Sequence, residues 1–197
     1  LQDLGAVMRQ IDLSNLASAD EAAARVRAAA ASVPPGTVLR GANWDQNKWP
    51  GAAFPHRRLL DEAAPRHLVW LDRVDGHAAW VSSSVLQRAG LDAKTKDPRG
   101  GEIVRDVSGE PTGILVDAAM DLAFDVLPAP SAAEVRDDLE RALQRCLEAG
   151  LTAVHDMGTS SEALAALRAL EAEGKLRLRV DVFHPGSAAD IVARLTN

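Results

Sequence analysis

The sequence predicts an α/β protein, because helical and strand patterns alternate in its second half with short connections between them. Apolar residues recur at helical spacing over residues 131–149 and 161–173, and they alternate with charged residues over 176–182. Strands separated by single helices predict parallel pairing through right-handed crossovers. The turn-rich stretch at 97–116 predicts a β-hairpin, which adds an antiparallel part to the first half.

The first predicted helix begins at a capping box, in which the side chains of Ser18 and Glu21 satisfy free backbone N–H groups. It runs through alanine-rich sequence to about Ser32, where a Pro-Pro-Gly sequence ends it. An apolar strand is expected at 37–40, and a loop is expected at 41–46.

The elements predicted next are a helical turn at 59–64, a buried strand at 68–71, a helix at 81–89 and hairpin strands at 103–105 and 112–116. Glycine follows the helix at position 90, which favours a left-handed C-cap. The serines at 82–84 lack the Gly-x-Ser-x-Gly pattern of a nucleophile elbow, so we interpret them as helix-capping residues.

From position 131 onward the pattern is more regular. Ser131 and Glu134 form a second capping box, and the helix that follows carries one apolar stripe: Val135, Leu139, Ala142, Leu143, Cys146 and Leu147. A strand is expected at 151–154, and a final helix is expected near Ser187. Because Cys146 lies on the apolar stripe, we expect it to be an inert core thiol.

The composition is that of an ordinary soluble globular protein, with 47% of the 197 residues apolar and 25% charged. A net charge of −6 argues against nucleic acid and anionic membranes as partners, and no apolar stretch is long enough to span a bilayer. The single cysteine excludes an internal disulfide and favours a cytoplasmic location. The chain begins at Leu1 without a visible signal peptide, so we expect a sequence cut at its front.

Functional residues of parallel α/β arrays gather where strands end, and several polar residues lie at such positions. They are Asp75 and His77 after the strand at 68–71, His155 and Asp156 after 151–154, His184 after 176–182, and Trp44 with Asp45 after 37–40. Histidine and aspartate are the residue types that proton transfer or a divalent metal requires.

Each of these candidates also has a plainer interpretation. An Asp-Gly pair such as Asp75-Gly76 is the usual composition of a turn, and Trp44 suits an apolar core or a pocket wall. A catalytic metal normally needs three or more protein ligands, and the sequence contains no His-x-His pair. We therefore predict no metal site formed by this chain alone.

Four segments in order, at 41–51, 73–81, 100–115 and 149–158, resemble the YtcJ-like branch of the amidohydrolase superfamily, amidohydrolase family 3. The resemblance implies a metal-dependent hydrolase on a (β/α)8 TIM barrel, in which a metal ion, zinc in our expectation, activates water to cleave amide-type C–N bonds. The His-x-His and later metal ligands of the family have no counterpart in this sequence, so we expect an internal fragment that is inactive alone.

Under this resemblance the chain is a partial barrel, comprising about strands two and three, that carries an α+β insertion with the β-hairpin. Residues 1–35 hold the helix of the first barrel unit, 36–130 are an inserted segment that covers the active site, and 131–197 supply β/α barrel units. The expected associations are with a small-molecule amide substrate and with missing barrel parts or a second copy of the chain.

The resemblance gives His77 and Asp75 a catalytic role in orienting the substrate or its leaving group. The expected substrate-binding residues are Trp44, Asp45, Asp117, His155 and Asp156. Two other functions stay open from the sequence: a non-catalytic α/β binding module, and a different hydrolase that uses Asp75 and His77 directly.

Overall fold

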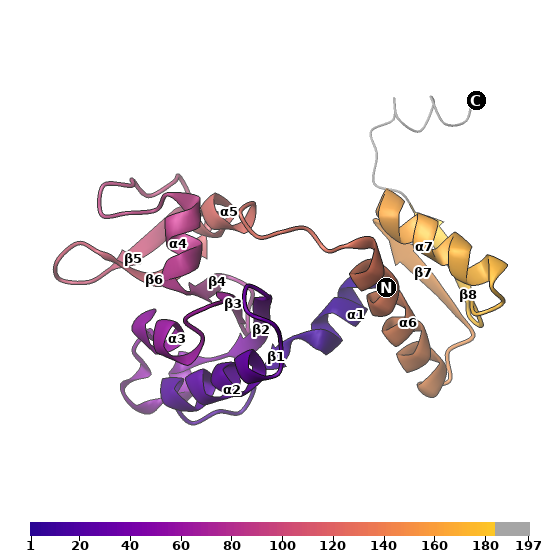
Figure 1. The fold of residues 1–197 in the computed structure, drawn as a ribbon, viewed down its shortest axis with the longest axis horizontal. Coiled ribbons are helices and arrows are strands. Elements are labelled where there is room, and N and C mark those ends of the chain that lie inside the picture. Colours follow the sequence, from indigo (N-terminus) through magenta and orange to yellow (C-terminus); the bar gives the residue numbers. More distant parts are fainter. Residues whose placement is uncertain (184–197) are drawn as a thin grey trace. The chain divides into compact units, whose positions relative to one another are not determined.

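The computed structural model describes residues 1–183, which divide into two compact units (Figure 1). Unit 1 joins Leu1–Arg9 to the chain from Ala129 onward, and unit 2 is the continuous segment Gln10–Pro128. The division groups the first residues with the second half of the chain, whereas the prediction placed 1–35 in one segment. The predicted segments refer to a whole barrel, so they stay a prediction.

Unit 2 is built on a six-stranded mixed sheet with strand order β1-β2-β3-β4-β6-β5. The strands are β1 (Ile11–Asp12), β2 (Val38–Trp44), β3 (Leu68–Arg73), β4 (Ala78–Val81), β5 (Gly101–Arg105) and β6 (Pro111–Asp117). The first three run parallel, and each later pairing is antiparallel. The predicted hairpin is confirmed as β5 and β6.

Helices cover both faces of this sheet. Against one face pack α2 (Ala19–Ala31) and α3 (Arg58–Ala63), in a core that includes Leu71 and Trp80. Against the other pack α4 (Ser83–Ala89) and α5 (Ala118–Phe124), in a core that includes Trp70 and Leu115. Two short 3-10 turns, η1 (Gln46–Lys48) and η2 (Pro50–Ala52), follow β2. Because neighbouring strand residues point to opposite faces, the sheet buries apolar side chains on both sides.

Unit 1 places helices beside a two-stranded parallel sheet. Its elements are α1 (Gln2–Arg9), α6 (Ala132–Glu148), β7 (Ala153–Met157), α7 (Ser161–Ala172) and β8 (Arg179–Phe183). The parallel pairing of β7 with β8 through α7 confirms the pattern predicted for the second half. At the crossing of α1 with α6, a Cβ built on Gly5 would lie 1.8 Å from the Asp138 carbonyl oxygen, so only glycine allows this approach.

The second predicted capping box is confirmed in full. Ser131 accepts the Glu134 N–H at 3.3 Å, and the Glu134 carboxylate accepts the Ser131 N–H at 2.8 Å. At the first box, Ser18 accepts the Glu21 N–H, but the Glu21 carboxylate accepts from Ala17 instead. Cys146 is buried among apolar residues, as expected.

The prediction of a helix at 81–89 is wrong in its first part, because Val81 is the last residue of β4 and the helix begins at Ser83. All four residues of β4 are buried, so the two-residue alternation that marks a half-buried strand is missing. Ser82 occupies the N-cap position of α4, but its hydroxyl accepts the Val69 N–H at 3.1 Å instead of capping the helix. Ser83 donates to the Asp61 carboxylate, so these hydroxyls join α4 to β3 and α3.

Two other boundaries also differ from the prediction. The loop predicted at 41–46 continues β2 as far as Trp44, with a bulge at Asn43, whose φ is 73°. The strand predicted at 151–154 begins at Ala153, because the Leu151 N–H still caps α6 through the Cys146 carbonyl at 3.0 Å. His184 and the helix expected near Ser187 lie outside the described residues. Within residues 1–183, no helix is long and apolar enough to cross a membrane.

Candidate functional site

The candidate site lies at one end of the central strands of the unit 2 sheet, where β3 turns into β4 and where β6 ends. Arg73 ends β3, and residues 74–77 form the hairpin that leads into β4. In the antiparallel register Ala78 pairs with Val116, so His77 and Asp117 are the next pair along. Residues 40 positions apart in the sequence therefore become cross-strand neighbours.

His77 and Asp117 form a directly hydrogen-bonded pair. The His77 Nδ1 atom lies 2.8 Å from Asp117 Oδ1, and the Asp117 backbone N–H donates to the His77 carbonyl at 3.0 Å. The two side chains are 72% and 49% exposed, so the pair is open to solvent. This geometry gives an accessible imidazole whose orientation is set by a carboxylate.

Asp117 has a backbone conformation that aspartate rarely adopts, with φ 47° and ψ −123°. Such a conformation costs a residue with a Cβ about 1–3 kcal/mol, and it persists only where the surroundings impose it. Two hydrogen bonds do so here, from the Asp117 N–H to His77 and from the Ala118 N–H to the Gly100 carbonyl at 3.2 Å. Position 101 must be glycine, since a Cβ there would lie 2.3 Å from the Ala119 nitrogen.

Asp75 holds the hairpin together. Its carboxylate pairs with the Arg73 guanidinium and accepts the His77 backbone N–H at 3.1 Å. The hydrogen bond from Arg73 lowers the pKa of the Asp75 carboxyl below its ordinary value, with the His77 N–H acting in the same direction. Gly76 has φ 73°, so the Asp-Gly pair is the turn that its composition indicates. Asp75 thus supports His77 through its backbone.

Trp44 lies in the core and is fully buried. Its indole N–H donates to the Leu71 carbonyl at 2.8 Å, and its ring stacks on Trp49 and meets Trp80 edge-on. Asp45 caps the 3-10 turn that follows, where its carboxylate accepts the Asn47 N–H at 3.1 Å. Both residues therefore hold the end of β2 in place.

His155 and Asp156 lie within β7 of unit 1 rather than after it, and they point to opposite faces. The His155 ring is 66% exposed and lies 3.2 Å from the Asp181 carboxylate on β8. Asp156 is buried and accepts the Thr159 hydroxyl at 2.6 Å and the amino group of Leu1. These two residues have separate partners in unit 1, whereas Asp75, His77 and Asp117 come together in unit 2.

The polar pair of Trp70 and Asp72 was not predicted. Asp72 accepts the Trp70 indole N–H at 2.7 Å, and its burial raises the pKa of its carboxyl, against the opposing influence of that hydrogen bond and of Arg40. Residues two apart in a strand share a face, so the spacing of Trp70 and Asp72 was a usable signal.

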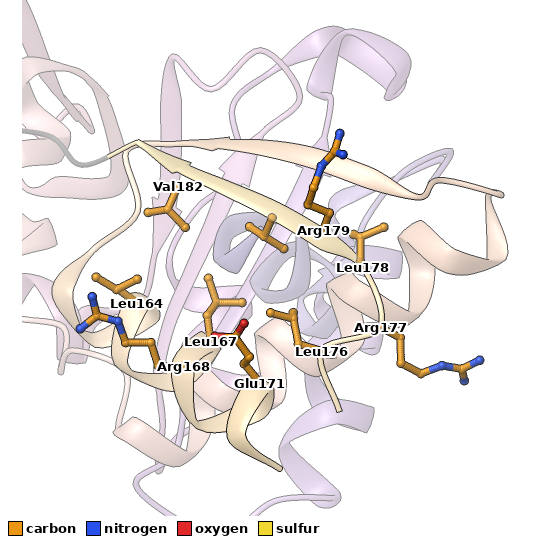
Figure 2. A pocket seen from close by; sticks show the side chains of 10 residues that line it. Leu164, Leu167, Arg168, Glu171, Leu176, Arg177, Leu178, Arg179 and Val182 are labelled. Carbon is orange, nitrogen blue, oxygen red and sulfur yellow. The ribbon is translucent and has the colours of Figure 1, made fainter. Parts of the chain in front are cut away.

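Unit 1 contains a hollow of about 450 Å³ between α7 on one side and β8 with the segment that leads into it on the other (Figure 2). Its lining is mainly aliphatic, from Leu164, Leu167, Leu176, Leu178, Val180 and Val182, with Arg168 and Glu171 from α7. Arg177 extends away from the hollow in Figure 2. None of the predicted site residues that the structure describes lines it.

The described residues do not fit a metal ion by themselves. Within residues 1–183, no three histidine, cysteine, aspartate or glutamate side chains converge as a metal site would require. At the candidate site the Asp75 carboxylate is paired with Arg73, and His77 Nδ1 is engaged by Asp117. The atoms left to bind a metal are therefore Nε2 of His77 and the second oxygen of Asp117, which are fewer ligands than a metal site needs.

Comparison with known proteins gives consistent relatives. A family model described as the amidohydrolase family matches residues 3–197. The protein LONG AFTER FAR-RED 3 of Arabidopsis thaliana is 40% identical over 78% of this chain and 26% of its own length. The putative amidohydrolase YtcJ of Bacillus subtilis is 34% identical over 92% of this chain and 35% of its own length.

A third relative is the N-substituted formamide deformylase of Arthrobacter pascens, 32% identical over 87% of this chain and 32% of its own length. The chain thus spans between about a quarter and about a third of the length of these curated relatives.

Two solved structures have a similar fold. Both are described as uncharacterized metal-dependent hydrolases, from Pyrococcus horikoshii and Pyrococcus furiosus, and each matches with a TM-score of 0.72. The first is 23% identical and covers 99% of this chain and 36% of its own; the second is 25% identical and covers 98% and 38%.

Proposed function

The chain belongs to the amidohydrolase family, and from this membership we propose that it is part of a metal-dependent hydrolase that cleaves an amide-type C–N bond. The observation that carries the proposal is the family match over residues 3–197. The bond type is supported by the relative named for N-substituted formamides, because a formamide contains an amide C–N bond.

In this proposal unit 1 contributes to a (β/α)8 barrel, with β7, α7 and β8 forming part of the repeating pattern. Residues 36–130, most of unit 2, are the segment inserted over the active site. The metal ion, zinc in our proposal, is held by residues outside this chain, because the His-x-His pair of the family has no counterpart in the sequence. The presence of one cysteine, buried in α6, supports a cytoplasmic location.

We assign the substrate-facing role to His77, whose imidazole is the most accessible of the three grouped residues. Asp75 fixes the hairpin that carries it, and Asp117 fixes its ring. Trp44 and Asp45 lie at the end of the neighbouring strand β2 and support the same end of the sheet. Trp44 does so from the core, where it is fully buried, and Asp45 does so by capping the turn that follows. In unit 1, His155 and Asp156 remain proposed substrate-binding residues, and the exposed His155 ring is the more accessible of the two.

The test compares two proteins: residues 1–197 alone, and the same chain expressed with whatever coding sequence flanks it. We expect the longer protein to hydrolyse N-substituted formamides, to lose activity with a chelator and to lose most of its activity in His77→Gln. Asp92→Asn, a loop carboxylate in the same unit, is the matched control and should leave turnover unchanged.

Residues 1–197 alone should bind no stoichiometric zinc and show no turnover. Tight zinc with amidase activity in this chain would overturn the placement of the metal ligands. A longer protein without hydrolase activity towards any amide would overturn the proposed reaction and would favour a non-catalytic binding module.

A further inference from the structure

We infer that Asp117 is a positioning residue for His77, holding the imidazole as its Nδ1–H tautomer so that Nε2 is presented to solvent as a hydrogen-bond acceptor. The use of Nε2 towards a substrate rests on the proposed function, but its availability does not. The group that it suits is a neutral donor, such as the N–H of an amide.

The first argument is the set of partners around His77. Its backbone N–H donates to Asp75 at 3.1 Å, and its carbonyl accepts the Asp117 N–H at 3.0 Å. Its Nδ1 lies 2.8 Å from Asp117 Oδ1. Among the described residues, Nε2 is the one polar atom of His77 without a hydrogen-bond partner. An ionised carboxylate only accepts hydrogen bonds, so Nδ1 carries the proton and Nε2 carries the lone pair.

The second argument is the residue type at position 117. Glycine would adopt φ 47° without the strain that a Cβ introduces, and the turn from β6 into α5 needs no side chain there. Asp117 makes no side-chain hydrogen bond to the start of α5, although it occupies the N-cap position. The recorded contact that its carboxylate does make is with His77. The strained residue is therefore explained by what its carboxylate does to the imidazole.

The test is the tautomeric state of the imidazole in the full 197-residue chain, read from long-range 1H–15N correlations at a mildly alkaline pH. We expect Nε2 of His77 to be unprotonated in the parent sequence. In Asp117→Asn and Asp117→Gly the ratio of Nδ1–H to Nε2–H forms should fall by roughly fivefold or more, because a hydrogen bond to a charged group is lost.

Asp117→Gly guards against a folding artefact, because it removes the carboxylate and relieves the strain together. His77→Gln identifies the resonance, and Asp92→Asn should leave the ratio unchanged. The inference is overturned if His77 is the Nε2–H tautomer in the parent chain, or if its ratio does not change in folded Asp117→Gly. Since no turnover is measured, failure here leaves the proposed reaction standing, and an inactive longer protein leaves the tautomer result standing.

Discussion

Unit 2 covers both faces of its sheet with helices, whereas in unit 1 the described residues leave one face of the two strands exposed. In unit 2, Leu71 and Trp70 are adjacent residues on opposite faces, and both are buried. In unit 1, the faces of β7 and β8 away from the helices carry Met157, which is 72% exposed, and Phe183, which is 46% exposed. The difference indicates that unit 2 buries both faces of its sheet, whereas the described part of unit 1 presents an exposed face with large apolar side chains.

The largest expected effect tests whether each core stabilises its own unit. Leu71→Ala in unit 2 and Leu139→Ala in unit 1 each empty a fully buried site, so each should cost about 2–5 kcal/mol of unfolding free energy. All 4 tryptophans lie in unit 2, at positions 44, 49, 70 and 80, so their fluorescence reports that unit alone. Leu71→Ala should shift the fluorescence transition, and Leu139→Ala should shift only the circular dichroism transition.

If Leu139→Ala moves the tryptophan transition as far as Leu71→Ala does, the two units unfold as one and the comparison fails. Val107→Ala, a fully exposed site on the β5–β6 turn, is the matched control and should change neither transition by more than about 0.5 kcal/mol.

The next effect concerns how α1 is held in unit 1. The Asp138 carboxylate on α6 is fully buried and pairs with the Arg9 guanidinium, which is one-third exposed. Arg9→Met leaves that charge without its cation and should destabilise unit 1 by about 1–3 kcal/mol. The measurement is urea unfolding followed by circular dichroism, with an unchanged tryptophan transition expected.

A matched arginine on α6 serves as the control. Arg136 pairs with Glu140 and Glu173, whose carboxylates are 43% and 39% exposed. Because exposed ion pairs contribute little, Arg136→Met should destabilise unit 1 clearly less than Arg9→Met does. Equal costs for the two variants would show that burial of Asp138 is not what makes its pair important.

A smaller effect concerns the strained backbone of Asp117 in unit 2. Asp117→Gly should stabilise unit 2 by about 1 kcal/mol, because glycine adopts φ 47° readily. Asp117→Ala keeps the strain and loses the carboxylate, so it should be less stable than the parent. Thermal melts monitored by tryptophan fluorescence distinguish the two, and a less stable Asp117→Gly would show that the backbone there is not strained.

The smallest effect concerns a buried carboxylate in unit 2. Burial raises the pKa of Asp72, so its charged form is disfavoured in the folded state at neutral pH. The penalty is complete above the raised folded value and disappears below the ordinary aspartate value, because the group is then neutral in both states. Asp72→Asn can still accept the Trp70 N–H, so it should stabilise unit 2 by less than about 1 kcal/mol at pH 7.

Comparing the stability of Asp72→Asn with that of the parent across pH tests this prediction. The advantage of Asp72→Asn over the parent should shrink as the pH falls towards the ordinary aspartate pKa of about 4. A variant that is less stable than the parent at neutral pH, with a gap that widens as the pH rises, would show that the interaction with Arg40 outweighs burial.

Elements whose signals are local were predictable from the sequence. The Ser131–Glu134 box and the stripe ending near Cys146 depend on residues a few positions apart, and the structure confirms them. The glycine C-cap at position 90 is confirmed in the same way, with φ 69°. Each of these features is complete within one helix, so no knowledge of tertiary neighbours is needed.

Features that depend on distant neighbours were not predictable. β4 has no alternation because both of its faces are buried, and that burial is a property of the assembled sheet. Asp75, His77 and Asp117 were each singled out, but the contact between His77 and Asp117 requires the register of β4 against β6. The strain at Asp117 has no sequence signal, since aspartate is common at ordinary helix N-caps.

The discontinuity of unit 1 has a consequence for synthesis on the ribosome. Unit 2 is one continuous segment and can fold as soon as it emerges, but Arg9 must wait for a carboxylate that lies 129 positions later in the chain. At typical elongation rates the delay is on the order of ten seconds. During that interval α1 has no partner helix, so the nascent chain presents an unpacked segment to chaperones and proteases while unit 2 is free to fold.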